Sequence, residues 1–397
     1  MEKLTSKSIY CDYNSTSPLS SSVLSFLDSG DFLYANPSSV HQLGKKSKKA
    51  IREVSDYILE LFSFGPQDRF CIFHSGATEG LNSLIIGLSY FHVLEQQQEL
   101  SFFYSPLDHS CVVNLCPLLE KLGVQTYELP VDETGSLLID ESIKIISNDQ
   151  ADFQLMSYTW VNNETGMVQS LENASLIKNK TGCVVIVDAV QSPGKVEEWR
   201  KLDSSLDAYV FSAHKFGAMK GVGFSLVRAD LKFRPALIGG GQQNGLRSGT
   251  ENIMGVQTIQ LALSDLVSKT SRDNYFDEQK SLVIELENCI SSFINDDRMM
   301  VSKRLLKRNV NTICFVSPKI KANILMMAMD LNGLQVSSGS ACSSGASLPS
   351  RVLTKLGYSN DESQGGIRLS FSPGFSRLEM KEVKKRLTLI LGKYYHK

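Results

Sequence analysis

Short apolar segments alternate with longer amphipathic segments between residues 69 and 227, and this alternation limits the possible folds most strongly. Seven apolar segments have the length of strands: residues 69–73, 101–104, 125–129, 153–157, 183–187, 208–211 and 223–227. Several are separated by segments with helical spacing of apolar residues, such as 77–90, 111–122 and 170–179. Strands that alternate with helices form βαβ units. We therefore predict an α/β fold with a mainly parallel, seven-stranded sheet.

The pattern changes near Asn252, where long helical segments replace the alternation. Residues 253–268 and 275–294 predict long helices, and four elements follow: a strand (311–315), a helix (321–331), a turn-rich loop (337–348) and a terminal helix (377–395). A chain of 397 residues usually divides into more than one domain. We predict a large domain over residues 18–255 and a smaller α+β domain formed by residues 1–17 and 256–397.

The composition excludes several classes of function. The net charge of −1 gives no reason to expect a direct nucleic-acid partner or a charged membrane surface. No apolar run has transmembrane length, and residues 1–6 lack the apolar core of a signal peptide, so we expect a cytoplasmic location. None of the eight cysteines forms a C-x-x-C pair, and we expect no metal site.

The first candidate site is the turn at residues 74–80, which joins a predicted strand to a predicted helix. Its small residues let backbone N–H groups approach an anion, and the helix dipole and the Thr78 hydroxyl would add to the binding. The alternative is an ordinary helix N-terminus with Glu79 close to it. Taken alone, this turn predicts either a phosphate site or a helix cap.

Asp188 and Lys215 follow two later strands, and the carboxyl ends of parallel strands meet at one edge of a sheet. A lysine amine forms a Schiff base with the aldehyde of pyridoxal phosphate (PLP), and a carboxylate keeps the pyridine nitrogen protonated. Gln191 is placed to bond the phenolic oxygen of the ring, and Ser212 and His214 are placed to contact the phosphate. A solvated loop acid and a surface lysine are the ordinary alternatives for each segment alone. The ordered combination predicts PLP as the cofactor.

Further motifs occur in a fixed order along the chain. They lie at residues 10–16, 36–41, 75–79, 108–109, 161–166, 239–243, 247–252 and 339–344. Through this set the chain resembles the class V aminotransferases, and specifically the cysteine desulfurases of the NifS/IscS type, from about residue 9 to the C-terminus. The resemblance implies a type I PLP-dependent transferase fold, with a large PLP-binding domain and a small domain that carries a catalytic cysteine loop.

The resemblance also assigns roles around the cofactor. It implies that His109 stacks on the pyridine ring and that Asn163 lies beside the ring, near the substrate. The alternatives are a histidine whose hydrogen bonds are made at the start of a helix, and an asparagine that forms part of a turn. The residues expected to bind the phosphate are Ala77, Thr78, Ser212 and His214.

Two more residues are assigned to the substrate and to a neighbouring subunit. Arg368 would bind the substrate carboxylate through two parallel bonds. A surface arginine is the alternative, although a position in an apolar run favours a bound partner, because an unpaired buried charge is costly. Thr250 would reach the phosphate in the neighbouring subunit, which implies a homodimer; alternatively, Thr250 caps the helix that begins at residue 253.

Cys342 decides the reaction that the resemblance implies. Glycines and small polar residues surround it, which favours a mobile, exposed loop, although an incidental loop cysteine would look the same. The substrate L-cysteine would react at PLP, with Lys215 and His109 moving protons, and the Cys342 thiolate would attack the substrate sulfur. The products would be L-alanine and a persulfide on Cys342, which passes its sulfur to an acceptor protein for iron–sulfur cluster assembly or for tRNA or other thiolation.

The chain departs from the family pattern at a few positions, which leaves alternatives open. The departures lie at residues 14–17, 108, 216–221 and 370–372, and none removes a chemical group. The alternative functions are a selenocysteine lyase, another class V enzyme that does not use Cys342, and a non-catalytic scaffold that retains the fold. The glycines at 239–241 lack the spacing of a nucleotide-binding loop, so that class of site is rejected.

Overall fold

The computed structural model describes residues 8–338 and 349–395 of the chain. Cys342, the residue predicted to carry sulfur, lies outside the described residues. No helix in the described ranges is both long and apolar enough to cross a membrane.

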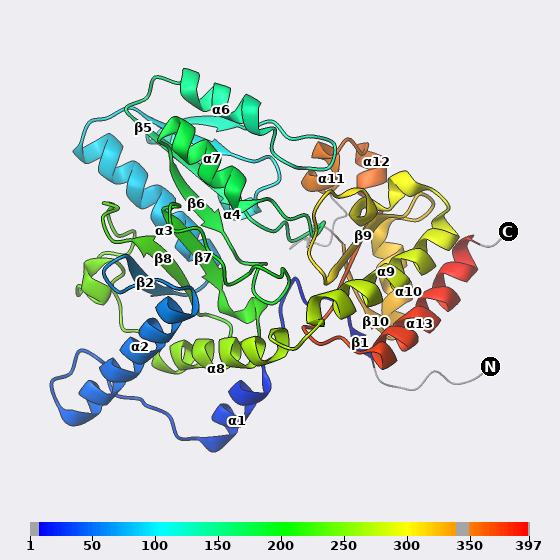
Figure 1. Cartoon of the computed structure of the whole chain (residues 1–397), viewed down its shortest axis with the longest axis horizontal. Coiled ribbons are helices and arrows are strands. Elements are labelled where there is room, and N and C mark those ends of the chain that lie inside the picture. The colour runs from blue at the N-terminus through cyan, green and yellow to red at the C-terminus, as the bar shows by residue number, and fades with distance from the viewer. Residues whose placement is uncertain (1–7, 339–348, 396–397) are drawn as a thin grey trace.

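A seven-stranded sheet forms the centre of the larger part of the molecule (Figure 1). Its strand order is β2-β8-β7-β6-β5-β3-β4. The strands are β2 (Arg69–His74), β3 (Leu100–Tyr104), β4 (Gln125–Glu128), β5 (Phe153–Thr159), β6 (Val184–Asp188), β7 (Ala208–Ser212) and β8 (Gly223–Arg228). Only β8 runs against its neighbours, so the predicted α/β fold with a mainly parallel sheet is confirmed.

Helices cover both faces of this sheet, because its strands are apolar on both sides. Along β6, Val185 and Val187 pack in one core with Trp199, while Ile186 packs in a second core with Leu81. Successive side chains of a strand point to opposite faces, which explains this division. The main helices of this part are α2 (Gln42–Leu61), α3 (Ala77–Ser89), α6 (Ile139–Asn148), α7 (Leu171–Thr181) and α8 (Ile253–Thr270).

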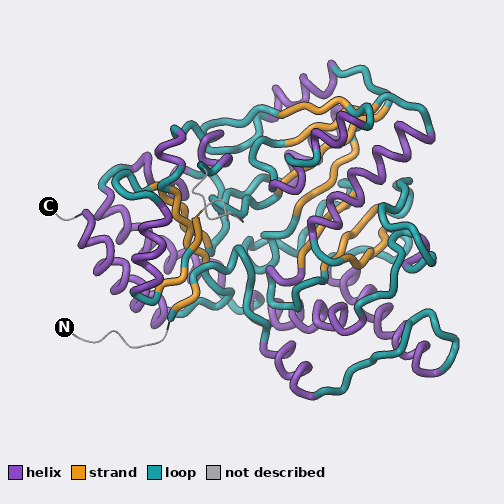
Figure 2. The backbone as a smooth tube through the Cα atoms, turned by 180° about the vertical axis from the view of Figure 1, so that it is seen from behind, coloured by secondary structure: helices purple, strands orange, loops and turns teal. Residues whose placement is uncertain are grey.

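The C-terminal elements, seen on the left in Figure 2, pack around a separate apolar core. An antiparallel sheet joins β11 (Ser337–Ser338), β12 (Gly366–Ser370) and β9 (Thr312–Val316). Near the N-terminus, β1 (Ile9–Tyr10) pairs in parallel with β10 (Leu334–Gln335), so the start of the chain packs with its end. The helices of this part are α9 (Tyr275–Ile294), α10 (Ala322–Leu331), α11 (Arg351–Lys355), α12 (Asn360–Ser363) and α13 (Arg377–Tyr395).

Two of the elements that differ from the prediction have a clear local cause. The helix expected over residues 111–122 is two short helices, α4 (Ser110–Val113) and α5 (Cys116–Lys121). Pro117 lies in the first turn of α5, where a missing N–H is tolerated, whereas inside one long helix its ring would clash with the preceding turn. Strand β12 was not predicted, because a charged arginine interrupts its short apolar pattern.

The remaining elements are short. They are α1 (Ser21–Ser29), a π-helical segment (Tyr90–Glu95) and the 3₁₀ turns η2 (Ala213–Lys215), η3 (Gln243–Gly245), η4 (Asp297–Met299) and η5 (Val301–Arg304). Of these, η2 matters most for function, because it follows β7 directly and ends at Lys215.

Candidate active site

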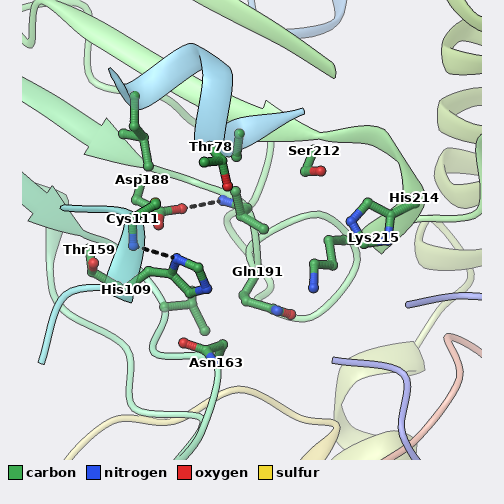
Figure 3. A pocket seen from close by; sticks show the side chains of 14 residues that line it. Thr78, His109, Cys111, Thr159, Asn163, Asp188, Gln191, Ser212, His214 and Lys215 are labelled. Atoms are coloured by element: carbon green, nitrogen blue, oxygen red, sulfur yellow. Dashed lines mark hydrogen bonds between the residues drawn. The ribbon is translucent and has the colours of Figure 1, made fainter. Parts of the chain in front are cut away.

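A cavity of about 240 Å³ lies at the carboxyl ends of β5, β6 and β7 (Figure 3). This is the edge at which open parallel sheets bind ligands. Nine of the predicted site residues line the cavity: Ala77, Thr78, His109, Asn163, Asp188, Gln191, Ser212, His214 and Lys215. The structure therefore brings together side chains that are spread over more than 100 positions of the sequence.

One end of the cavity is suited to an anion. Helix α3 begins here after Gly76, and no side chain caps its N-terminus. Ser212 lies opposite: a Cβ added to Gly76 would lie 3.6 Å from the Ser212 Oγ, so a side chain there would enter the space between them. Free N–H groups and the helix dipole favour a phosphate group at this position.

His214 lies beside this anion end and is uncharged at neutral pH. Burial, followed by the nearby Lys215 and Lys220 charges, lowers the pKa of His214 to about 4. Its Nδ1 lies 3.1 Å from the Thr16 Oγ1, which fixes the ring. A neutral imidazole retains one N–H, so it binds an anion by hydrogen bonding without adding a positive charge.

Asp188 ends β6 and is 7% exposed. Burial raises the pKa of this carboxyl, while a bond from the Val190 N–H to Oδ1 (3.0 Å) and the His109 and Lys215 charges oppose the rise. A buried carboxylate gains most from a cationic partner. The Asp188 side chain therefore meets the requirement for holding a protonated pyridine nitrogen, and the alternative of a solvated loop acid is wrong.

His109 lies next to Asp188 in the cavity (Figure 3). Its Nδ1 accepts a bond from the Cys111 N–H (3.2 Å), so it also caps α4, as the alternative interpretation expected. Burial lowers the pKa of His109, and the Asp188 carboxylate opposes this shift. The preceding residue, Asp108, accepts a bond from the Thr159 hydroxyl (2.7 Å), which holds the His109 segment against β5.

Lys215 extends into the cavity from η2, on the side opposite His109 (Figure 3). Its Nζ donates to the backbone carbonyls of Asn14 (2.8 Å) and Ser15 (2.7 Å). Burial, followed by the Arg368 charge, lowers its pKa to about 8. An amine with this pKa is about one-tenth uncharged at pH 7, which makes it a usable nucleophile. The alternative of a solvated surface lysine is therefore wrong.

Arg368 lies on β12 behind the turn that contains Asn163, and it is 2% exposed. It donates to the Asp12 carboxylate (2.6 Å), to the Ser15 hydroxyl (2.8 Å) and to the Asn163 carbonyl (3.0 Å). Its Nε has no hydrogen-bond partner in the described part of the chain. The alternative of a surface arginine is therefore wrong, and the guanidinium contacts Asn163, which lines the cavity, without lining the cavity itself.

Like Arg368, Thr250 is a predicted site residue that does not line this cavity. Thr250 is exposed and precedes α8, whose cap is Asn252: the Asn252 side chain accepts from the Gly255 N–H (3.0 Å). The alternative role of Thr250 as that cap is therefore wrong. Cys342 is not among the described residues, but the described chain reaches β11, where Ser337 pairs with Arg368, immediately before the segment that carries it.

The prediction missed several lining residues: Leu81, Cys111, Thr159, Val161 and Val190. Thr159 ends β5, two residues beyond the predicted strand, so a correct strand end would have found it. The other omissions are apolar or thiol side chains that form walls, and no local pattern distinguishes them from core residues.

Comparisons with known proteins agree with this geometry. Residues 9–383 match the Aminotransferase class-V family. Cysteine desulfurase 2 of Trichormus variabilis is 32% identical over 376 residues, which are 94% of this chain and 91% of that protein. Cysteine desulfurase IscS of Dictyoglomus turgidum is 32% identical over 92% of this chain and 89% of its own length. Among solved structures, a NifS-like protein superposes with a TM-score of 0.85 at 26% identity, covering 97% of this chain and all of the other chain.

Proposed function

The chain belongs to the class V aminotransferase family, and from this premise we propose that it is a PLP-dependent cysteine desulfurase. It would convert L-cysteine to L-alanine and place the sulfur on Cys342 as a persulfide. The observation that carries the proposal is that Lys215 and Asp188 line one cavity with the uncapped N-terminus of α3. An amine, a buried carboxylate and an anion cradle are the three features that PLP requires.

The residues present fit PLP in one orientation. The first turn of α3, Ser212 and His214 would hold the phosphate, Asp188 would hold the pyridine nitrogen, and His109 would lie against the ring. Gln191 would face the phenolic oxygen. Bound PLP supplies an electron sink that stabilises negative charge at the substrate Cα.

The chain's own residues would then direct this chemistry toward sulfur. Arg368 would bind the substrate carboxylate through its guanidinium, whose buried Nε has no partner among the described residues. The Lys215 amine would remove the proton from the substrate Cα, and His109 would help return protons to the product. The Cys342 thiolate would attack the substrate sulfur, forming the S–S bond of the persulfide while the C–S bond breaks.

The proposal extends to partners and location. A homodimer would place the exposed Thr250 of one subunit at the phosphate of the other. An acceptor protein would take the sulfur for iron–sulfur cluster assembly or for tRNA or other thiolation. We propose a cytoplasmic location, since a reducing compartment keeps the Cys342 thiol free to attack.

The rate at which the apoprotein captures PLP should rise with pH and level off above about pH 8. Burial lowers the pKa of Lys215 to about 8, and only the uncharged amine attacks the aldehyde. The uncharged fraction therefore grows about tenfold per pH unit below this value and saturates above it. Stopped-flow absorbance of PLP binding measures this profile. A rate that continues to rise to the ordinary lysine pKa of 10.5 would contradict the shift.

The proposed function is tested by incubating the PLP-loaded protein with L-cysteine and a reducing thiol, then measuring L-alanine and sulfide. Equal amounts of both products are expected, because each turnover breaks one C–S bond. Turnover of selenocysteine without turnover of cysteine would establish the lyase alternative instead. A protein that shows no visible PLP absorbance would support the scaffold alternative.

A further inference from the structure

Lys195 is a buried lysine to which the proposed function gives no role. It lies four residues after Gln191 and is 1% exposed. Burial lowers its pKa well below the usual value, the Lys215 and Arg368 charges lower it further, and Asp12 opposes them. Burying an amine is costly unless its N–H groups are bonded, so its partners indicate what it does.

The amine has two partners, Gln191, which lines the cavity, and Asn14, whose backbone carbonyl accepts from Lys215. Its Nζ donates to the Gln191 Oε1 and to the Asn14 Oδ1 (3.2 Å). The Gln191 Nε2 in turn donates to the Asn14 backbone carbonyl (2.8 Å), which also accepts from the Lys215 Nζ (2.8 Å). Lys195 is thus connected to Lys215 through the Gln191 side-chain amide and the Asn14 backbone carbonyl.

These bonds fix which end of the Gln191 amide faces the cavity. The Lys195 amine offers N–H donors, so the Gln191 oxygen turns toward it and the Gln191 N–H group turns away. The Asn14 amide is fixed similarly, because its oxygen also accepts from the Asn311 side chain (3.3 Å) and its nitrogen donates to the Thr312 hydroxyl (2.9 Å). Without Lys195, the one remaining bond of the Gln191 amide within residues 8–338 and 349–395 would be the bond to the Asn14 carbonyl, which Lys215 shares.

We propose that Lys195 is a positioning residue that keeps the Gln191 N–H group directed at the phenolic oxygen of PLP. This inference rests on the proposed function. A donor at that oxygen stabilises its negative charge, so the Schiff-base nitrogen on Lys215 loses its proton at a lower pH. The charged and titratable groups around Lys215 are Arg368, Asp12, Asp188, His109, His214 and Lys195 itself. Changing Lys195 therefore also removes a charge, and the test has to separate that effect from the orientation of the Gln191 amide.

The test is a pH titration of the visible absorbance of the PLP-loaded protein, which needs no turnover. Lys195→Met should raise the midpoint by about one pH unit, the effect of one lost hydrogen bond to a charged group. Lys195→Gln, which loses the charge but keeps an N–H donor, should stay near the wild-type midpoint. The matched control is Lys201→Met, which removes an exposed charge six residues away.

A double-mutant cycle shows whether Lys195 acts through Gln191. In a Gln191→Ala background, Lys195→Met should cause no further shift of the midpoint, because the amide that it orients is gone. An equal shift in both backgrounds would overturn the proposal, and so would a shift in Lys195→Gln as large as in Lys195→Met, since both would show a direct charge effect.

A final variant covers the case in which Lys195→Met does not fold. Gln191→Glu keeps an oxygen that accepts from Lys195, but it places a second oxygen, an acceptor, where the N–H donor faced the ring. The midpoint of its absorbance titration should therefore also rise. An unchanged midpoint in Gln191→Glu would overturn the proposal. Failure of the proposed function is distinguishable, because it would appear as a wild-type protein without PLP absorbance or without alanine formation.

Discussion

Replacing Lys215 with alanine is expected to remove the Schiff-base absorbance of PLP and to lower turnover of L-cysteine by about 10³- to 10⁴-fold. Among the described residues, Lys215 is the one lysine that lines the cavity. Its amine would serve twice, first as the covalent attachment of PLP and then as the base at the substrate Cα. The Asn14 and Ser15 carbonyls hold the amine in place.

The measurement combines an absorbance spectrum with quantification of L-alanine. Lys220→Ala is the matched control, since Lys220 is exposed in the turn that follows and lies outside the cavity. Both spectrum and turnover should stay at wild-type values in this control. If Lys215→Ala keeps the Schiff-base absorbance, borohydride reduction and peptide mapping would identify the amine that holds PLP, and Lys195 would be the first to examine.

The sheet could be predicted from the sequence because each of its strands corresponds to one short apolar segment. Strands such as β6 are buried on both faces and appear as short apolar runs between helical segments. The edge of the sheet then indicated the site, because Asp188 and Lys215 follow strand ends. Strand β12 could not be recognised in this way: a charged residue lies at its centre, and its bonds to Asp12, Ser15 and Asn163 make that charge tolerable in the interior.

The supporting contacts of the site were beyond sequence reasoning for a physical reason. The Arg368–Asp12 pair joins residues 356 positions apart, and the Lys195–Asn14 bond joins residues 181 positions apart. Such contacts depend on how the N-terminal segment passes between the sheet and the C-terminal elements. The spacing of apolar residues along the sequence reveals the periodicity of strands and helices, but it does not reveal the path of the N-terminal segment.

Replacing Cys342 with alanine is expected to lower formation of L-alanine from L-cysteine by about 10³-fold or more while leaving the PLP absorbance intact. The absorbance depends on Lys215 and the cavity, and none of the lining residues that the structure describes is changed. The reaction depends on a thiolate that attacks the substrate sulfur, and alanine has no such group. Mass spectrometry after reaction with L-cysteine should find the persulfide on the Cys342 peptide of the wild-type protein alone.

The rival nucleophile is Cys111, which lines the same cavity. Burial, followed by the Asp188 and Asp108 charges, raises the pKa of the Cys111 thiol to about 12. Since the thiolate is the reactive form, a thiol with this pKa is almost wholly unreactive at neutral pH. Cys289→Ala, on α9 and away from the cavity, is the matched control and should retain both persulfide and turnover. A persulfide on Cys111 that is still formed in Cys342→Ala and is lost in Cys111→Ala would contradict the mechanism proposed for Cys342. It would show that Cys111 accepts the sulfur.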